Sequence, residues 1–190
     1  MTQKHERSII NLKSSEKLQR FLEKNDIHKK DFAEMIGVTL SYVYNLIDNT
    51  IPFSSRSTTI ERIACVMDVE PEEFDEYKIP QEPILIDEST QFLKDKLKEK
   101  NMSTQQFLKS FPRKKRVEIV DILRGATPIP IDWKELNMIG SVLDVKNDQL
   151  YEIWETRLLN LFDTVGFNVK NNQGLVDAMF DCAKNYILKK

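Results

Sequence analysis

The sequence repeats itself, and this internal repeat constrains the fold more than any other feature of the chain. The clearest match is between Ile63-Ala-Cys-Val-Met-Asp-Val69 and Ile139-Gly-Ser-Val-Leu-Asp-Val145, and the apolar positions around it keep their register apart from one inserted residue. Chance rarely preserves an apolar register over two such long segments. The 190 residues are therefore predicted to contain a first repeat, 15–78, and a second repeat, 90–157.

Apolar residues in both repeats recur at the spacing of helices. Leu18, Phe21 and Leu22 form a stripe at i, i+3 and i+4, and Gly37 is suited to a left-handed helix end. The chain contains only five glycines, which argues against a turn-rich β-sandwich. We therefore predict an all-α protein with five short helices in each repeat.

Three local patterns predict where helices begin. Ser15 is a candidate cap for the first helix of the first repeat. The segment Glu70-Pro71-Glu72-Glu73 has the proline and the acids that favour a helix start, and it predicts the fifth helix of that repeat. In the second repeat, Ser103 and Gln106 have the spacing of a capping box.

The segments outside the repeats have separate expected roles. Residues 1–14 are expected to be a flexible N-terminus, and the two prolines of the linker, 79–89, predict an extended chain. Apolar residues in 158–190 predict two further helices, the first running from Leu158 to near Gly166. We expect this C-terminal pair to form a homodimer or to dock a protein partner.

Two short helices joined by Gly37-Val38-Thr39 resemble the helix-turn-helix of Cro and the phage repressors, the XRE family. The first repeat matches that family at Phe32-Ala33, Gly37-Val38-Thr39, Ser41, Val43 and Leu46, and then along the apolar run 60–69. The resemblance covers nearly all of the first repeat. It implies that the third helix is a recognition helix, whose first residues face base edges in the major groove of double-stranded DNA.

The resemblance also implies which side chains contact DNA. The base-facing positions of the family fall on Thr39, Leu40, Ser41 and Asn45, and the phosphate-contacting positions fall on Lys29, Lys30, Tyr42 and Arg56. Asparagine can form two hydrogen bonds to adenine, and leucine can contact a thymine methyl group. The alternative interpretation is a helical bundle on which these are only solvated side chains.

This sequence departs from the family at three places. His28-Lys29 stands where Thr-Gln usually opens the second helix, and Ile47 and Asn49 stand where the third helix usually ends with Glu and Gly. The missing glutamine removes a usual phosphate and base contact, although Lys29 still offers a positive charge. Asn49 is expected to adopt the left-handed conformation that glycine supplies.

The second repeat resembles the family less closely. Pro112 stands where the turn glycine is expected, and Asp121 stands at a base-reading position. A candidate second phosphate patch is formed by the basic run Arg113, Lys114, Lys115 and Arg116. A charged surface turn explains the same run equally well, so both interpretations stay open.

The net charge of −2 and the pI near 5.8 do not by themselves favour nucleic acid as a partner. The excess of acids over bases is concentrated in one short segment, however, at 68–80. The electrostatic potential of a local surface matters more for binding than the sum of all charges. The overall charge therefore leaves room for a basic DNA-binding face.

No enzyme is expected, because no catalytic constellation, cofactor motif or metal-ligand spacing occurs. Cys65 and Cys182 are far apart and lack the neighbours that a zinc site requires. No apolar run is long enough to cross a membrane. A cytoplasmic location is therefore expected, at the nucleoid if the protein binds DNA.

The leading functional hypothesis is a sequence-specific, repressor-like transcriptional regulator that binds double-stranded DNA. One alternative is a protein-interaction scaffold built from degenerate helix-turn-helix units that do not bind DNA. Another is an antitoxin, in which the first repeat represses its operon while the C-terminal helices neutralise a toxin.

Overall fold

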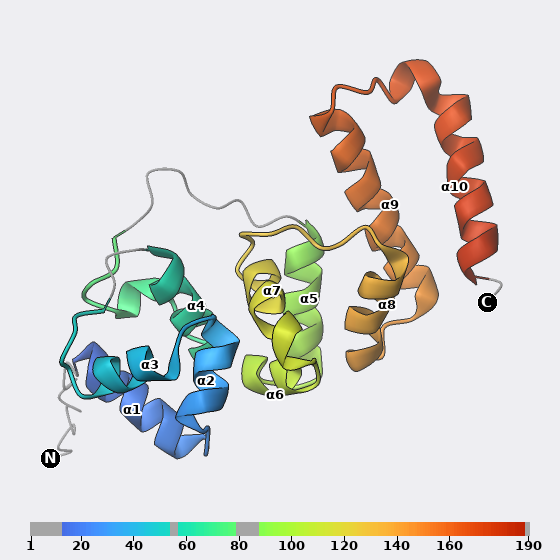
Figure 1. Cartoon of the computed structure of the whole chain (residues 1–190). Helices are drawn as coiled ribbons and strands as arrows, with labels where there is room; N and C mark the ends of the chain where they lie inside the picture. The colour runs from blue at the N-terminus through green and yellow to red at the C-terminus, as the bar shows by residue number, and fades with distance from the viewer. Residues whose placement is uncertain (1–12, 54–56, 79–87, 189–190) are drawn as a thin grey trace, which may run out of the picture. The chain divides into compact units, whose positions relative to one another are not determined.

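The computed structural model describes residues 13–53, 57–78 and 88–188. In these residues 71% of the positions are helical, with ten α-helices, two short 3-10 helices and no strand (Figure 1). The prediction of an all-α protein is therefore confirmed. Most of the linker and of residues 1–14 lies outside the described part, so the expectations for those segments stay predictions.

The chain divides into two compact units. The N-terminal unit is drawn from residues 1–83 together with Arg113–Val120, and the C-terminal unit from 84–112 together with Asp121–Lys190. The basic run of the second repeat thus belongs to the N-terminal unit.

The N-terminal unit contains α1 (Ser14–Lys24), α2 (Lys29–Ile36), α3 (Leu40–Ile47), α4 (Ser57–Met67) and the 3-10 helix η1 (Pro71–Glu73). Helix α2 packs against α3 and α4, α1 packs against α3, and η1 packs against α4. Its core is made of fully buried side chains from all four α-helices, among them Leu18, Phe32, Ile36, Leu46, Ile60 and Ile63. This core fixes the packing of α2 against α3.

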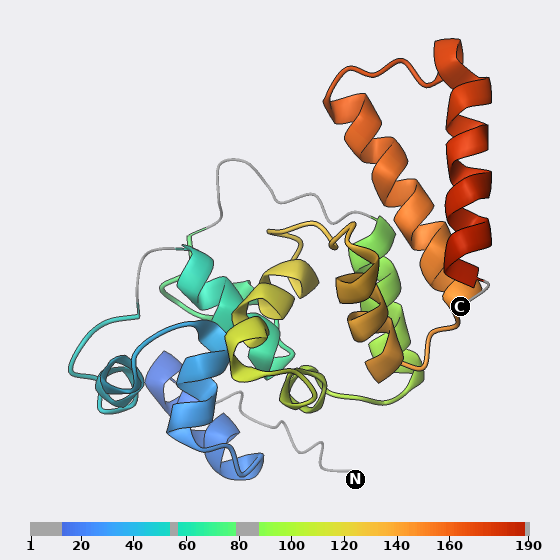
Figure 2. The ribbon, with the colours of Figure 1, turned by 45° about the vertical axis from the view of Figure 1, so that its right-hand side comes forward.

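The C-terminal unit contains α5 (Glu88–Glu99), α6 (Thr104–Lys109), α8 (Trp133–Val142), α9 (Asn147–Thr164), the 3-10 helix η2 (Lys170–Asn172) and α10 (Gln173–Leu188). The end of α7 (Arg113–Leu123) also belongs to it. Fully buried side chains of its core include Leu93, Phe107, Leu108, Ile122, Leu136 and Leu150. Helix α8 packs against α9, and α10 packs against α9 as an antiparallel hairpin (Figure 2).

The backbone conformation repeats along with the sequence. Asp68 after α4 and Asp144 after α8 have positive φ angles of 55° and 48°. The next residue of each pair, Val69 or Val145, donates its N–H to a carbonyl of the preceding helix, that of Ala64 or of Gly140. The same sequence pattern therefore ends two helices in the same way.

Several local predictions are confirmed. Gly37 caps α2 with a left-handed φ of 73°, and Asn49 after α3 has a φ of 54°. Ser103 and Gln106 form both hydrogen bonds of the capping box at α6.

One predicted helix start and one predicted helix length are wrong. Helix α1 begins at Ser14 with Lys13 as its N-cap, so Ser15 lies inside the first turn, where it is buried. The predicted fifth helix is only the three-residue η1. It ends because Phe74 takes an extended conformation, which places its ring in the core at 5.8 Å from the ring of Phe53.

The separate helix predicted from Leu158 is also wrong. Helix α9 runs without a break from Asn147 to Thr164, so the expected boundary between residues 157 and 158 falls inside it. No glycine or proline interrupts this segment, and nothing therefore ends the helix there. The second predicted helix corresponds to α10.

Candidate nucleic-acid interface

The turn between α2 and α3 is built by Gly37, Val38 and Thr39. The left-handed Gly37 reverses the chain, and the N–H of Val38 bonds the carbonyl of Ala33 at 3.0 Å. Thr39 then caps α3, because its Oγ1 accepts a hydrogen bond from the N–H of Tyr42 at 3.2 Å. The sequence of this turn therefore fixes the angle at which α3 leaves α2.

The outward face of α3 carries the four residues predicted to face bases. Val43 and Leu46 are fully buried, which turns the opposite side of the helix to solvent. The exposed side chains are those of Thr39 at the N-cap, Leu40, Ser41, Tyr44 and Asn45. Helix α3 contains no charged residue, so this face is neutral and hydrogen-bonding, with Leu40 and Tyr44 as its large apolar groups.

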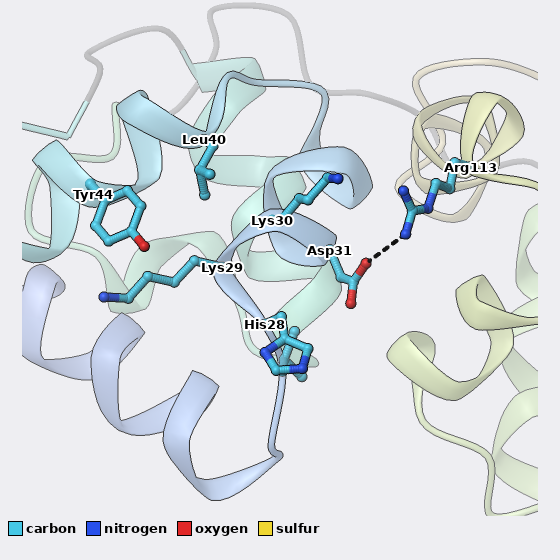
Figure 3. Close-up of a pocket in the computed structure, with 8 residues that line it drawn as sticks. His28, Lys29, Lys30, Asp31, Leu40, Tyr44 and Arg113 are labelled. Atoms are coloured by element: carbon cyan, nitrogen blue, oxygen red, sulfur yellow. Dashed lines mark ion pairs between the residues drawn. The ribbon is translucent and has the colours of Figure 1, made fainter.

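The two lysines of α2 lie beside this face (Figure 3). The Nζ of Lys29 lies 4.5 Å from the ring centroid of Tyr44, in a cation–π contact between α2 and α3. Lys30 is exposed and Tyr42 is half-buried. Arg56, the fourth predicted phosphate contact, lies outside the described residues.

A hollow lies between the start of α2, the start of α3 and Arg113 (Figure 3). Its lining consists of Ile27, His28, Lys29, Lys30, Asp31, Leu40, Tyr44 and Arg113. Three of these side chains are basic and one is acidic. The side chain of His28, the N-cap of α2, does not bond the amides of the first turn. The positive end of the α2 dipole thus adds to the cationic character of the hollow.

The basic run of α7 lies against acids of α2. The Nε of Arg113 lies 3.1 Å from Oε2 of Glu34, and a terminal nitrogen of Arg113 lies 3.6 Å from Oδ1 of Asp31. Arg116 also approaches Glu34, at 3.9 Å. The arginines thus neutralise the two acids that α2 places beside the hollow.

The two lysines of the run differ from the arginines. Lys115 pairs with Glu118 on its own helix at 2.9 Å, whereas Lys114 is exposed. The four residues predicted as a second phosphate patch therefore do not form one open cationic surface. Arg113 reaches the hollow beside α3, and Lys114 is exposed.

Tyr44, Asp31 and Glu34 belong to this site, and none was predicted. Tyr44 could have been found from the helical period, because it lies four residues after Leu40 on the side opposite Val43 and Leu46. No comparable pattern could have revealed Asp31 and Glu34, because their partners come from a distant part of the chain.

Other kinds of site receive no support in the described part of the chain. No three side chains among its His, Cys, Asp and Glu residues are grouped as metal ligands. None of its helices is long and apolar enough to cross a membrane. In comparisons with known proteins, no family, curated protein or solved structure matched the chain.

Proposed function

We propose that this protein is a sequence-specific, repressor-like transcriptional regulator that inserts α3 into the major groove of DNA. The observation that carries the proposal is the outward face of α3. The turn before α3 is closed by the left-handed Gly37 and the Thr39 cap, and Thr39, Ser41 and Asn45 are exposed. The lysines of α2 lie beside this face. Such a protein would act in the cytoplasm, at the nucleoid.

The chemistry of α3 fits base edges. Asn45 can donate to and accept from adenine at once, and Leu40 suits a thymine methyl group. Ser41 can act as a donor or an acceptor, and it tolerates several bases. Lys30 and the adjacent Lys29 would contact phosphates, which position a protein on the duplex without reading its sequence.

The ion pairs of α7 support the same proposal. Asp31 and Glu34 would repel the DNA backbone if they stood alone on α2. Arg113 and Arg116 lie close enough to offset both charges. A chain with a net charge of −2 can therefore still present a non-repulsive face beside α3.

Selection from random duplex DNA followed by fluorescence anisotropy tests the proposal. Asn45→Ala should weaken binding to the selected sequence roughly 5- to 150-fold, the loss of about 1–3 kcal/mol for a bidentate base contact. Its effect should be smaller on unrelated DNA. The matched control is Asn160→Ala, an exposed asparagine on α9, which should bind like the unmodified chain. Absence of salt-sensitive binding at micromolar protein would contradict the proposal.

A second candidate function is a protein-interaction scaffold. It is favoured by the exposure of Leu40 and Tyr44, 38% and 44%, on the same face of α3. Large exposed apolar side chains often mark protein interfaces. The scaffold would be favoured over the regulator by two results together. The protein would show no affinity for DNA, and a protein partner would protect Tyr44 from chemical modification.

A further inference from the structure

Helix α10 carries two parallel apolar stripes. The inner stripe, Val176, Phe180, Ala183 and Ile187, has the i, i+4, i+7, i+11 spacing of one helix face and is buried or half-buried. It packs on α9, where the hydroxyl of Tyr151 donates to the carbonyl of Phe180 at 2.8 Å and the ring of Trp154 meets that of Phe180 edge-on. Helix α9 thus covers this half of the apolar surface of α10.

The outer stripe, Leu175, Met179, Cys182 and Tyr186, has the same spacing displaced by one residue. Neighbouring residues of a helix lie about 100° apart around its axis, so the outer stripe runs beside the inner one and away from α9. All four side chains are exposed, with Leu175 at 57%, Met179 at 45% and Tyr186 at 66%. The apolar sector of α10 is therefore wider than α9 can cover.

The outer stripe exposes a large part of the apolar area that an interface needs. At these exposures its three large side chains leave on the order of 300 Å² in water, if a fully exposed one presents about 200 Å². A stable interface takes about 800 Å² from each partner, of which little more than half is apolar. Together with exposed Ala178 and Cys182, the stripe supplies most of that apolar part.

We propose that the outer stripe binds the outer stripe of a second copy of this chain, with the two α10 helices antiparallel about a two-fold axis between residues 180 and 181. Such an axis places Leu175 of one copy opposite Tyr186 of the other. It places Met179 opposite Cys182 in the same way. Every large side chain of the stripe then meets an apolar partner, as a self-complementary two-fold interface requires.

The distribution of charge on α10 favours a second copy as the occupant. A surface that binds itself meets its own charges, so like charges along the contact would repel. The outer stripe contains no charged residue, and exposed Asp177 and Lys184 lie nearly opposite it around the helix axis. The absence of cations along the stripe also makes DNA an unsuitable occupant.

Sedimentation velocity of the full chain tests the proposal with two matched variants. The unmodified protein should be a dimer at micromolar concentration. Met179→Lys places a cation in the outer stripe and should raise the dimer dissociation constant at least 100-fold. Asp177→Lys places the same cation two residues away on the far side of α10 and should leave the dimer intact. Far-UV circular dichroism and thermal melting check that both variants fold.

Disulfide formation tests the orientation in a Cys182→Ser background. An equimolar mixture of Leu175→Cys and Tyr186→Cys proteins should form a mixed disulfide dimer. Neither variant should form a disulfide dimer with itself, because the same residue of the two copies lies about 16 Å apart along the antiparallel helix pair. A monomer at 100 µM, equal dissociation of the two lysine variants, or cross-linking between like positions would overturn the proposal. DNA affinity is measured separately, so either proposal can fail without the other.

Discussion

At the residue scale, Gly37 joins local backbone chemistry to packing. Its φ of 73° is one that side-chain-bearing residues adopt at a cost. A Cβ at this position would also lie 3.0 and 3.2 Å from the two methyl carbons of Val117. The same residue therefore ends α2, orients α3 and leaves room for α7.

We expect Gly37→Ala to destabilise the N-terminal unit by about 1–3 kcal/mol, combining left-handed strain with crowding against Val117. Urea unfolding measured by circular dichroism provides the free energy of unfolding. Gly166→Ala is the matched control, because Gly166 has the same φ of 73° but nothing within 4 Å of the added Cβ. A loss at Gly37 no larger than that at Gly166 would show that Val117 accommodates the methyl group.

Predictions about single residues were confirmed where the interacting groups lie within a few positions of each other in the sequence. Gly37 and the Ser103–Gln106 box act on backbone groups of their own turn, so the sequence alone predicted them. The partners of Glu34 were beyond such reasoning, because only folding brings Arg113 to α2. The base-facing residues of α3 remain a prediction, although the structure exposes all four together.

At the scale of elements, helix length depended on the residues just beyond the last helical position. Glu70-Pro71-Glu72-Glu73 favours a helix start, but burial of Phe74 in the core stops η1 after one turn. Between Leu150 and Thr164 no such competitor exists, and α9 continues through the predicted boundary. The early end of η1 thus depends on tertiary burial of Phe74, which the local sequence pattern does not contain.

The α9–α10 hairpin should lose stability at high pH through Tyr151. Burial, and then the nearby carboxylates of Glu155 and Asp181, raise the pKa of Tyr151 above its usual value. The neutral phenol is therefore favoured in the folded state, and its contribution is fully present below about pH 10. As the pH rises further, the unfolded chain loses the Tyr151 proton at a lower pH than the folded chain does. The free energy of unfolding therefore falls until the pH has passed the folded-state pKa.

Thermal melting between pH 8 and pH 11.5 measures this effect against Tyr151→Phe. The substitution should lower the melting temperature at pH 8, because the hydrogen bond to the carbonyl of Phe180 is lost. It should also flatten the decline above pH 10. If the melting temperature declines equally steeply in both proteins, groups other than Tyr151 cause the decline.

At the scale of the whole molecule, the repeat was the most informative part of the sequence. It predicted two segments of matching architecture, and the left-handed aspartates after α4 and α8 show that the matched segments end their helices alike. It could not predict that Arg113–Val120, within the second repeat, pack in the N-terminal unit. Matching segments of the two repeats therefore pack against different helices, because the packing of a segment depends on the whole chain.

The packing of α7 on α2 leads to a prediction about DNA affinity that involves both repeats. If α7 offsets the acids of α2, the double substitution Arg113→Gln with Arg116→Gln should weaken DNA binding roughly 3- to 10-fold, about 1 kcal/mol of restored repulsion. Adding Glu34→Gln should recover most of that loss, because it removes the acid that both arginines approach. Anisotropy titrations on one selected duplex, with Lys115→Gln as the control, measure all four proteins. Failure of Glu34→Gln to restore binding would mean that the arginines contact DNA directly, and that the basic run belongs to the DNA-binding surface itself.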